Sequence, residues 1–442
     1  MLSGDLLICG GRVLDPAASL DLEAGCVLVS EGRVIRVAPS LEAKGARVLD
    51  ARGMVVAPGF VDLHTHLREP GFEYKETIET GTQAAARGGF TTVCAMPNTQ
   101  PPLDSRETVD FVRKRAAERG LVRVLPIGCV TKGRVGVELA DLAELAAAGC
   151  VAFSDDGSPV ADAGLMRRAL EAARDLGLAI IDHCEAPAMS GGSMHEGWVS
   201  ARLGLKGIPA ASEETTVARD IALARETGSH VHIAHVSTAG SVALVREAKA
   251  RGVRVTAEVT PHHLTLTHEA VLRQDVGAEP PYDTNAKMYP PLRSAEDVAA
   301  CVAGLLDGTI DAIATDHAPH AQGDKSCSFE AAAFGMVGLE TALALVLTRA
   351  PSIGLVRAVE ALTIGPVRAL GLDRFVPGAG TLRPGAPADI VVFDPAAEWQ
   401  VRPGDFASRG KNTPLAGATL RGLVVATIFG GTVVFAREGV EV

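Results

Sequence analysis

Histidine and aspartate residues stand where short apolar runs of the chain end, and their spacing suits metal binding. His64 and His66 are one residue apart, so both imidazoles face the same way if the run is a strand. The other candidates, each ending a further apolar run, are Asp155, Asp156, His183, His235 and Asp316. Imidazole and carboxylate groups are the ligands expected for zinc or a similar divalent ion. The sequence therefore predicts a metal centre wherever these runs end together.

Each residue of this set also has a structural interpretation. A single histidine at a strand end is often a hydrogen-bonded structural residue, and Asp156 before Gly157 is an ordinary turn former. Independent turn and core residues have no reason to collect at one edge, so the combination favours a metal site. Among the other histidines, His262, His263 and His317 are candidates to support the ligands, whereas His195, His230, His232 and His268 are expected to lie away from them.

The elements that must position these residues alternate between strand-like and helix-like runs. We expect strands at 54–63, 89–96, 122–130, 150–153, 178–183, 230–236, 253–259 and 310–315, and helices at 105–119, 138–148, 161–176, 212–227 and 240–251. Eight parallel strands, each followed by a helix, make an α/β fold of the (β/α)8 TIM-like barrel type. The alternative, an open doubly wound sheet, would need a Gly-x-Gly-x-x-Gly loop, which the chain lacks. In a barrel the carboxyl ends of the strands meet at one face, which would bring the ligands together.

The two ends of the chain share a β-rich texture, with short runs at 5–13, 25–37, 47–56, 388–393 and 422–434. We expect both ends to form one small β-sandwich domain, with two separate β-tails as the alternative. The predicted domains are 1–57 (β-sandwich, N-terminal part), 58–365 (metal-dependent barrel) and 366–442 (β-sandwich, C-terminal part).

Composition excludes several classes of protein. The 442 residues are 47% hydrophobic and 21% charged, which argues against a disordered or fibrous chain. A net charge of −11 with 4% aromatic residues argues against nucleic acid as a partner. Apolar runs stop well short of the roughly 18 residues that cross a bilayer, so we expect no membrane association and a cytoplasmic location. The eight cysteines have no C-x-x-C spacing, and we expect buried thiols rather than disulfides.

Six motifs together resemble those of the dihydroorotases of the amidohydrolase superfamily, more narrowly the long bacterial type with an appended β-sandwich. They are His-Thr-His-Leu-Arg-Glu-Pro-Gly at 64–71, Met-Pro-Asn-Thr at 96–99, Ser-Asp-Asp-Gly at 154–157, Asp-His-Cys-Glu at 182–185, His-Val-Ser at 235–237 and Thr-Asp-His-Ala-Pro-His at 315–320. The resemblance covers nearly the whole chain, and the first and last motifs in combination are specific. It implies reversible cyclisation of N-carbamoyl-L-aspartate to L-dihydroorotate plus water in de novo pyrimidine (UMP) biosynthesis.

The resemblance also implies a ligand set for two divalent metal ions, with zinc as first choice and a hydroxide held between them. His64, His66 and Asp316 would bind the first ion, and His183 and His235 the second. Many relatives bridge the two ions with a carboxylated lysine, but this chain has Asp155-Asp156 there, as in the subgroup with a bridging aspartate. By that pattern the bridge is Asp156, although strand alternation alone does not choose between the two. Metal identity stays open, since this ligand set suits zinc, manganese or cobalt.

Asp316 would be the catalytic group, because a carboxylate beside the metals can take up and return a proton. By the same resemblance the substrate-binding residues are His66, Leu67, Arg68, Asn98, His320, Phe334 and Gly335. Arg68 suits bidentate pairing with the free carboxylate of the substrate. Its structural alternative is a surface ion pair with Glu69 or Glu73.

One position departs from the family pattern. The residue before Pro290-Pro291-Leu292-Arg293 is usually an asparagine that contacts the substrate ring, but here it is Tyr289. The Tyr289 hydroxyl could replace the hydrogen bond of the amide, or Asn285 could supply an amide instead. A packing role for Tyr289 is the further alternative.

Two other functions remain as alternatives. A hydantoinase or allantoinase would share the fold and the first two histidines but normally uses the bridging lysine. An inactive dihydroorotase-like scaffold for aspartate transcarbamoylase would lack metal ligands that are present here. The expected partners are the small-molecule substrate and further copies of the chain in a homo-oligomer, with aspartate transcarbamoylase as an additional candidate.

Overall fold

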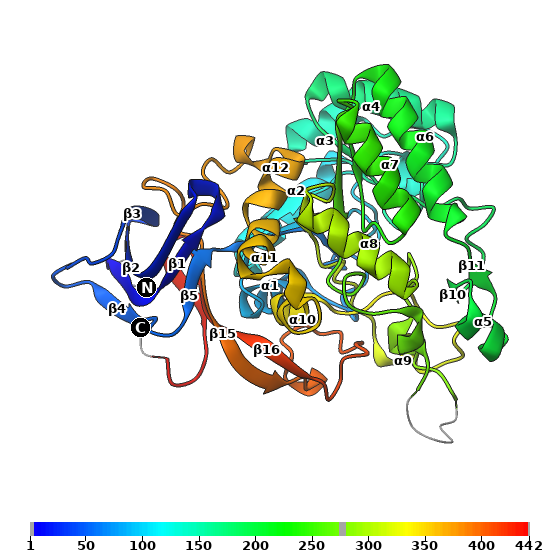
Figure 1. The fold of residues 1–442 in the computed structure, drawn as a ribbon. Helices are drawn as coiled ribbons and strands as arrows, with labels where there is room; N and C mark the ends of the chain where they lie inside the picture. Colours follow the sequence, from blue (N-terminus) through cyan, green and yellow to red (C-terminus); the bar gives the residue numbers. More distant parts are fainter. Residues whose placement is uncertain (1–3, 274–279, 441–442) are drawn as a thin grey trace.

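The computed structural model describes residues 4–273 and 280–440, in which a sheet built from both chain ends adjoins a larger region of helices and strands (Figure 1). The sheet has eight strands in the order β17-β16-β15-β5-β1-β2-β3, with β4 paired to β1. Their bounds are β1 (Leu6–Asp15), β2 (Leu20–Ser30), β3 (Arg33–Ala38), β4 (Arg47–Asp50), β5 (Val55–Pro58), β15 (Ile390–Gln400), β16 (Thr419–Phe429) and β17 (Thr432–Ala436).

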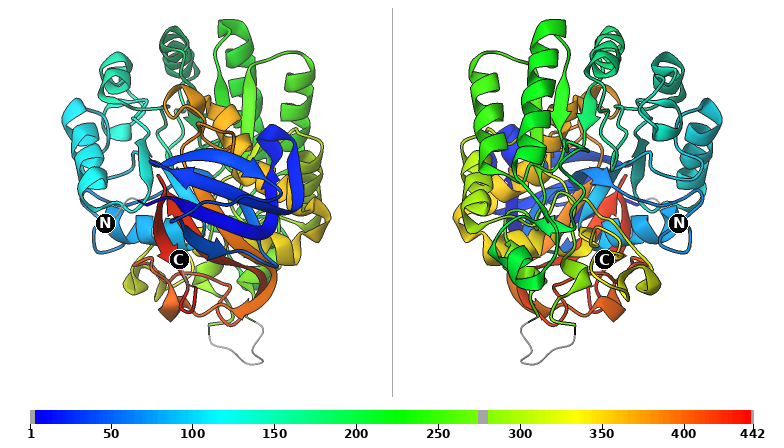
Figure 2. Two further views of the ribbon diagram at one scale, coloured as in Figure 1. Left: turned by 90° about the vertical axis from the view of Figure 1, so that its left-hand side faces the viewer. Right: turned by 90° about the vertical axis from the view of Figure 1, so that its right-hand side faces the viewer.

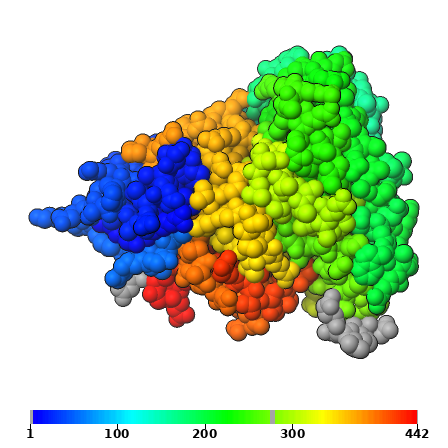
Figure 3. All heavy atoms as spheres, viewed as in Figure 1, coloured from blue at the N-terminus to red at the C-terminus, as the bar shows by residue number. Residues whose placement is uncertain are grey.

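The antiparallel pairing of β5 with β15 joins the two ends of the chain, since Pro58 lies opposite Ile390. Apolar side chains from both ends then bury one another in a single cluster, which includes Leu6, Val27, Val56, Ile390 and Ala426. The space-filling view places the blue N-terminal strands against the orange and red C-terminal segment (Figure 3). The two ends thus share one sheet and one core.

In the described residues seven parallel strands form the inner layer of the larger region, and all but β8 are largely buried. They are β6 (Phe60–Thr65), β7 (Phe90–Ala95), β8 (Arg123–Pro126), β9 (Ile180–Asp182), β12 (Val231–Ile233), β13 (Val255–Val259) and β14 (Ala312–Ile313). Ladders link β6-β7-β8 and β9-β12-β13-β14. Phe153 bridges Gly128 to Ile180, and Thr65 pairs with His317, so the parallel pairings return to their starting strand.

Most of the predicted strands are shorter in the structure, and two of them also differ in how they pair. The run 54–63 is two strands, because the backbone changes partner at Gly59: its N–H donates to Asp389 of the shared sheet, whereas the next N–H, of Phe60, donates to Gly89. Gly59 is also pressed against Thr91, whose Oγ1 would lie 2.2 Å from a Cβ at this position. The run 150–153 pairs only through Phe153 and forms no extended ladder.

Helices cover the outside of these strands (Figure 2). Their bounds are α1 (Ile78–Arg87), α2 (Arg106–Arg119), α3 (Leu142–Ala148), α4 (Ala163–Leu176), α5 (Trp198–Leu203), α6 (Ala211–Thr227), α7 (Ala239–Ala250), α8 (Ala295–Leu306), α9 (Gln322–Lys325), α10 (Ala342–Arg349), α11 (Leu355–Leu362) and α12 (Ile364–Leu370). The helix expected at 138–148 starts only at Leu142, because Asp141 caps it by accepting the N–H of Glu144. Among the described residues, no helix is long and apolar enough to cross a membrane.

The prediction that the cysteines form no disulfide was wrong for one pair. Cys9 and Cys26 lie opposite each other on the antiparallel strands β1 and β2 and are disulfide-bonded. Their 17-residue separation carries no motif, because only the register of the two strands brings them together. Five other cysteines are buried free thiols, and Cys327 is an exposed one.

Candidate metal and active site

Asp156 lies between four histidines at the carboxyl ends of the parallel strands. Its Oδ1 is 3.1 Å from Nε2 of His64 and 3.7 Å from both Nδ1 of His183 and Nε2 of His235. Its Oδ2 is 3.5 Å from Nε2 of His66. Among the described residues, two groups could each hold a metal ion around this carboxylate, namely His64, His66 and Asp156, and Asp156, His183 and His235. The carboxylate of Asp156 therefore belongs to both candidate metal positions.

Asp155 lies in a different environment from its neighbour. It accepts hydrogen bonds from the backbone N–H groups of Val130 (2.9 Å) and Thr131 (3.1 Å) and from the Thr131 hydroxyl. Its oxygens are thus occupied by the loop after β8. Strand alternation alone left open which of the two aspartates joins the histidines. In the structure Asp156, not Asp155, lies among them.

Asp316 completes the cluster from the end of β14. Its Oδ1 is 3.0 Å from Nε2 of His66 and 3.7 Å from Nε2 of His64. The backbone of Asp316 (φ 45°) and of His235 (φ 30°) lies in the left-handed region, which disfavours residues with a Cβ. Such strain persists only where the surrounding structure imposes it, and it is commonest at functional sites.

Glu258, in β13, holds two of the histidines from behind. Its carboxylate accepts from Nδ1 of His64 (2.8 Å) and from Nε2 of His232 (3.2 Å). Burial alone would raise the pKa of Glu258, but its bonds to the two histidines lower it to about 2. The bond at Nδ1 leaves Nε2 of His64 directed at Asp156, as outer partners of metal-binding histidines do. We expected His232 to lie away from the candidate ligands. It is instead linked to one of them, His64, through the carboxylate of Glu258.

The donor set fits divalent cations. Within the described chain, Nε2 of His64, Nε2 of His183 and Nδ1 of His235 are buried and have no hydrogen-bond partner. Burial favours the neutral acid at Asp156, yet His64, His183 and His235 hold its pKa well below the usual value. Beside Asp156, Nδ1 of His183 and Nε2 of His235 lie 2.9 Å from each other. Imidazole nitrogens thus gather around a buried anion, an arrangement that a zinc-like cation satisfies.

A cavity of about 240 Å³ opens beside this cluster. Besides the ligands it is lined by Arg68, Asn98, Gly157, Tyr289, Ala318, His320, Phe334 and Gly335. Of the predicted substrate-binding residues, only Leu67 is missing from this lining, because its side chain packs in the apolar core and its Cδ2 would meet a Cβ at Gly81.

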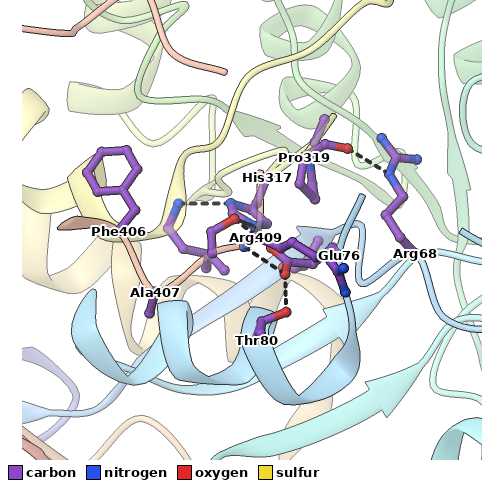
Figure 4. A network of polar contacts seen from close by, with 12 residues as sticks. Arg68, Glu76, Thr80, His317, Pro319, Phe406, Ala407 and Arg409 are labelled. Atoms are coloured by element: carbon purple, nitrogen blue, oxygen red, sulfur yellow. Dashed lines mark hydrogen bonds and ion pairs between the residues drawn. The ribbon is translucent and has the colours of Figure 1, made fainter. Parts of the chain in front are cut away.

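Arg68 lies at the cavity wall with its backbone in the left-handed region (φ 60°). Its Nε donates to the carbonyl of Pro319 at 3.3 Å (Figure 4), and burial lowers the pKa of its guanidinium. The two glutamates of the alternative ion pair are engaged elsewhere: Glu69 pairs with Arg115 at 2.7 Å, and Glu73 accepts the N–H of Gly71. The guanidinium therefore faces the cavity.

Asn98 and His320 line the cavity and also form hydrogen bonds with other residues of the protein. The Oδ1 of Asn98 lies 2.9 Å from Nδ1 of His66, and its Nδ2 donates to Asp156 at 3.3 Å. Asn98 can thus orient two ligands as well as face a substrate. His320 donates from Nε2 to the carbonyl of Phe334 at 2.7 Å.

Tyr289 and Asn285 lie in different cavities. The ring of Tyr289 lines the cavity of the ligands, with its centroid 4.5 Å from that of His183 and 5.1 Å from that of Phe334. Burial raises the pKa of its hydroxyl to about 12. Asn285 instead lines a separate hollow beside Cys327.

The other histidines surround the site without joining the ligand groups. His263 bonds to Thr260 and to the carbonyl of Pro290, and Nε2 of His262 is buried without a partner in the described chain. His317 bonds through Nε2 to Glu76 at 3.3 Å. The rings of His195 and His268 lie tilted against each other with centroids 5.0 Å apart, and neither residue lines the cavity.

The cavity beside the shared carboxylate suits a metal-dependent hydrolase, and the relatives of the chain make it one of the cyclic amide type. Among solved structures, the chain is similar to an L-hydantoinase (dihydropyrimidinase) from Arthrobacter aurescens, with a TM-score of 0.87 and 26% identity over 99% of this chain and 98% of that one. A D-hydantoinase (dihydropyrimidinase) from Thermus sp. aligns with a TM-score of 0.83 and 26% identity, covering 99% and 96% of the two chains.

Sequence similarity narrows the class to one family. A family model described as dihydro-orotase-like matches residues 53–241. A dihydroorotase from Pelotomaculum thermopropionicum is 56% identical over 97% of this chain and 98% of its own length, and one from Anaeromyxobacter sp. is 54% identical over 98% of both. The chain belongs to the dihydroorotase family, which confirms the resemblance seen in the motifs.

Proposed function

We propose that this chain catalyses the reversible cyclisation of N-carbamoyl-L-aspartate to L-dihydroorotate plus water, in pyrimidine biosynthesis. The observation that carries this function is the single carboxylate of Asp156 between two histidine pairs, with Arg68 and His320 on the wall of the same cavity. A cyclic amide with a free carboxylate needs both a hydrolytic centre and a cationic clamp, and the cavity combines them.

The described residues suit two divalent cations, which we propose to be zinc. His64, His66 and Asp316 would hold the first, His183 and His235 the second, and Asp156 would touch both. When bound, the two cations supply a water of lowered pKa and polarise the carbonyl that this water attacks. The cluster of buried acceptor atoms described above supports this assignment.

The remaining steps belong to side chains of this chain. A carboxylate oxygen of Asp316 takes up a proton during ring opening and delivers it to the departing ring nitrogen, and it reverses these roles in ring closure. The guanidinium of Arg68 pairs with the substrate carboxylate, together with Asn98 and His320. The segment at Phe334 and Gly335 offers backbone groups to the ring.

The architecture that we propose for this activity is a (β/α)8 barrel of residues 58–365 with a small β-sandwich of residues 1–57 and 366–442. The cyclic order of parallel pairings supports the barrel. The sheet and core shared by both chain ends support the second domain. Assembly into a homo-oligomer, association with aspartate transcarbamoylase and a cytoplasmic location stay predictions.

The test is a comparison of substrates on purified protein, with metal analysis. We expect ring closure of N-carbamoyl-L-aspartate and ring opening of L-dihydroorotate, close to two divalent ions per chain, and loss of activity with a chelator. Asp316→Asn should retain protein fold and lose turnover. Turnover of hydantoin or allantoin without any turnover of dihydroorotate would move the function to the alternative amidohydrolases. Absence of both activities in folded protein would favour the scaffold.

A further inference from the structure

A segment that belongs to the sheet region reaches into the wall of the candidate active site. We call residues 401–418, between β15 and β16, the strap. The strap is closed at its base, because Val401 and Ala418 pair through the N–H of Val401 (2.8 Å), and the N–H of Gly417 also donates to Val401. It then extends from this base to the loops that follow β14.

Two buried carboxylates fix the middle of the strap, and Figure 4 shows one of them, Glu76. Glu76 accepts from the hydroxyl of Ser408 at 2.5 Å and from the N–H of Arg409 at 3.0 Å. Glu340 accepts from the N–H groups of Ala407 and Ser408, both at 3.1 Å. These bonds come from two separate segments of the larger region, so the strap is held in place before it reaches the cavity.

The side chain of Asn412 forms hydrogen bonds with the backbone of two separate loops. Its Nδ2 donates to the carbonyls of Ala318 (3.0 Å) and Gly335 (3.1 Å), and its Oδ1 accepts from the N–H of His320 (2.9 Å). Its backbone carbonyl also accepts from Val337 at 2.9 Å. The residue is 5% exposed, so water does not compete for these bonds.

The three residues that the Asn412 side chain holds all line the cavity. Ala318 and His320 follow β14, whereas Gly335 lies beyond α9. The two loops meet closely, since a Cβ at Gly335 would lie 2.5 Å from the Cβ of Ala318. Nearby in the strap, Gly410 packs against Pro319 so tightly that a Cβ there would lie 2.5 Å from the Cβ of Pro319.

We infer that Asn412 is a positioning residue that sets His320 and Gly335 at a fixed separation for the substrate. The inference rests on the proposed function, because it assigns the substrate carboxylate and ring to these two residues. Asn412 contacts no candidate metal ligand in the described hydrogen bonds, so it acts on substrate recognition rather than on the metal centre. Misplacing a binding group by about 1 Å is enough to weaken binding strongly.

The first test is a kinetic comparison of Asn412→Ala with Arg409→Ala. The control removes an exposed side chain from the same strap and leaves the backbone N–H that binds Glu76. In Asn412→Ala we expect KM for L-dihydroorotate to rise about tenfold, with kcat changed less than about threefold and metal content unchanged, because the loss concerns binding geometry. The control should match the unmodified protein in all three.

A second substrate probes the carboxylate contact itself. Dihydrouracil has the ring of dihydroorotate without its carboxylate, so the preference for dihydroorotate over dihydrouracil should shrink in Asn412→Ala. If Asn412→Ala does not fold, Asn412→Asp has the same size, keeps the acceptor for the N–H of His320 and loses both donors; the same shift in KM is then expected. Unchanged KM in a folded variant, or a loss of kcat that follows loss of metal, overturns the inference, as does failure of both variants to fold.

Hydrogen exchange separates this inference from the proposed function. In the protein without substrate, Asn412→Ala should speed amide exchange in peptides that cover 318–320 and 335–337, and Arg409→Ala should not. Exchange unchanged in those peptides overturns the positioning role, whatever the substrate is. An unmodified protein that turns over no dihydroorotate, but whose exchange responds in this way, instead refutes the proposed function alone.

Discussion

Asp62 accepts two hydrogen bonds from Thr315, one from its backbone N–H at 2.8 Å and one from its hydroxyl at 2.5 Å. The same carboxylate accepts from the N–H of His64 and the hydroxyl of Thr65. It thereby ties the strand that carries two candidate ligands to the segment that carries Asp316. A single buried carboxylate thus links the first and last strands of the ring beside the candidate metal ligands.

Replacing Asp62 by alanine should destabilise the protein by about 3–5 kcal/mol, because four buried donors lose their acceptor. It should also lower metal affinity, since His64 and Asp316 are no longer held together. Urea unfolding and metal titration measure the two effects. Asp62→Asn retains one acceptor oxygen and should cost less in both; equal stability of all three proteins would contradict the role.

Substitution of the two neighbouring aspartates should affect the metal content of the protein differently. Asp156→Asn keeps the volume but removes the charge between two cations, so bound metal and activity should fall together. Asp155→Asn should keep its metal and lose about 1–3 kcal/mol of stability, because it weakens the bonds to the loop at 130–131. Metal analysis of both variants tests this assignment. Loss of metal in Asp155→Asn but not in Asp156→Asn would make Asp155 the bridging residue.

If Asp156 replaces a carboxylated lysine, activity should not depend on dissolved carbon dioxide. Peptide mass spectrometry should likewise find no carbamate on the segment with Asp156. A carbon dioxide requirement would show that a lysine outside the predicted ligand set takes part.

Tyr289→Phe should lower kcat/KM for dihydroorotate by an amount equal to about 0.5–1.5 kcal/mol, because Tyr289 lines the cavity and its hydroxyl could bond to the ring of a bound substrate. Asn285→Ala serves as the comparison and should leave kcat/KM unchanged, since Asn285 faces another hollow. A large loss in Asn285→Ala with none in Tyr289→Phe would return the contact to Asn285.

Lys325 should make stability depend on pH. Burial and then the nearby charge of Lys287 lower its pKa to about 7, while its ammonium donates to the carbonyls of Ala333 and Thr284. Above pH 7 the native state releases a proton that the unfolded chain, with a pKa near 10.4, still holds. The unfolding free energy contributed by Lys325 therefore rises from about pH 7 to pH 10, by at most about 1.4 kcal/mol per unit.

The measurement is the difference in unfolding free energy between the unmodified protein and Lys325→Gln. It should be constant below about pH 6 and increase from pH 7 to pH 9. The titratable groups that act on this lysine, Lys287, Asp283, Cys327 and Asp324, are present in both proteins, so their own titration largely cancels. A difference that stays constant across this range would contradict the assignment.

The clustering of the candidate ligands could be predicted from sequence because each stands at or just after the end of a buried apolar run, and the carboxyl ends of parallel strands meet at one face. Glu258 was missed although a glutamate inside the apolar run 253–259 is itself a signal of a buried partner. Asn412 and the pairing of Cys9 with Cys26 could not be predicted, because tertiary packing and strand register alone bring their partners near. For the same reason, the sequence does not predict that the run 54–63 forms two strands. Both halves are equally apolar, and they differ only in the strand with which each one pairs.

The pairing of β5 with β15 also has a consequence for synthesis of the chain. β5 leaves the ribosome roughly 330 residues before its partner β15, which at ordinary elongation rates is a wait on the order of tens of seconds. During that time one backbone edge of β5 and its apolar face are uncovered, a state that favours contacts with other nascent chains. Chains stalled before residue 390 are therefore expected to be recovered with chaperones or in aggregates, whereas completed chains should bury this edge on release.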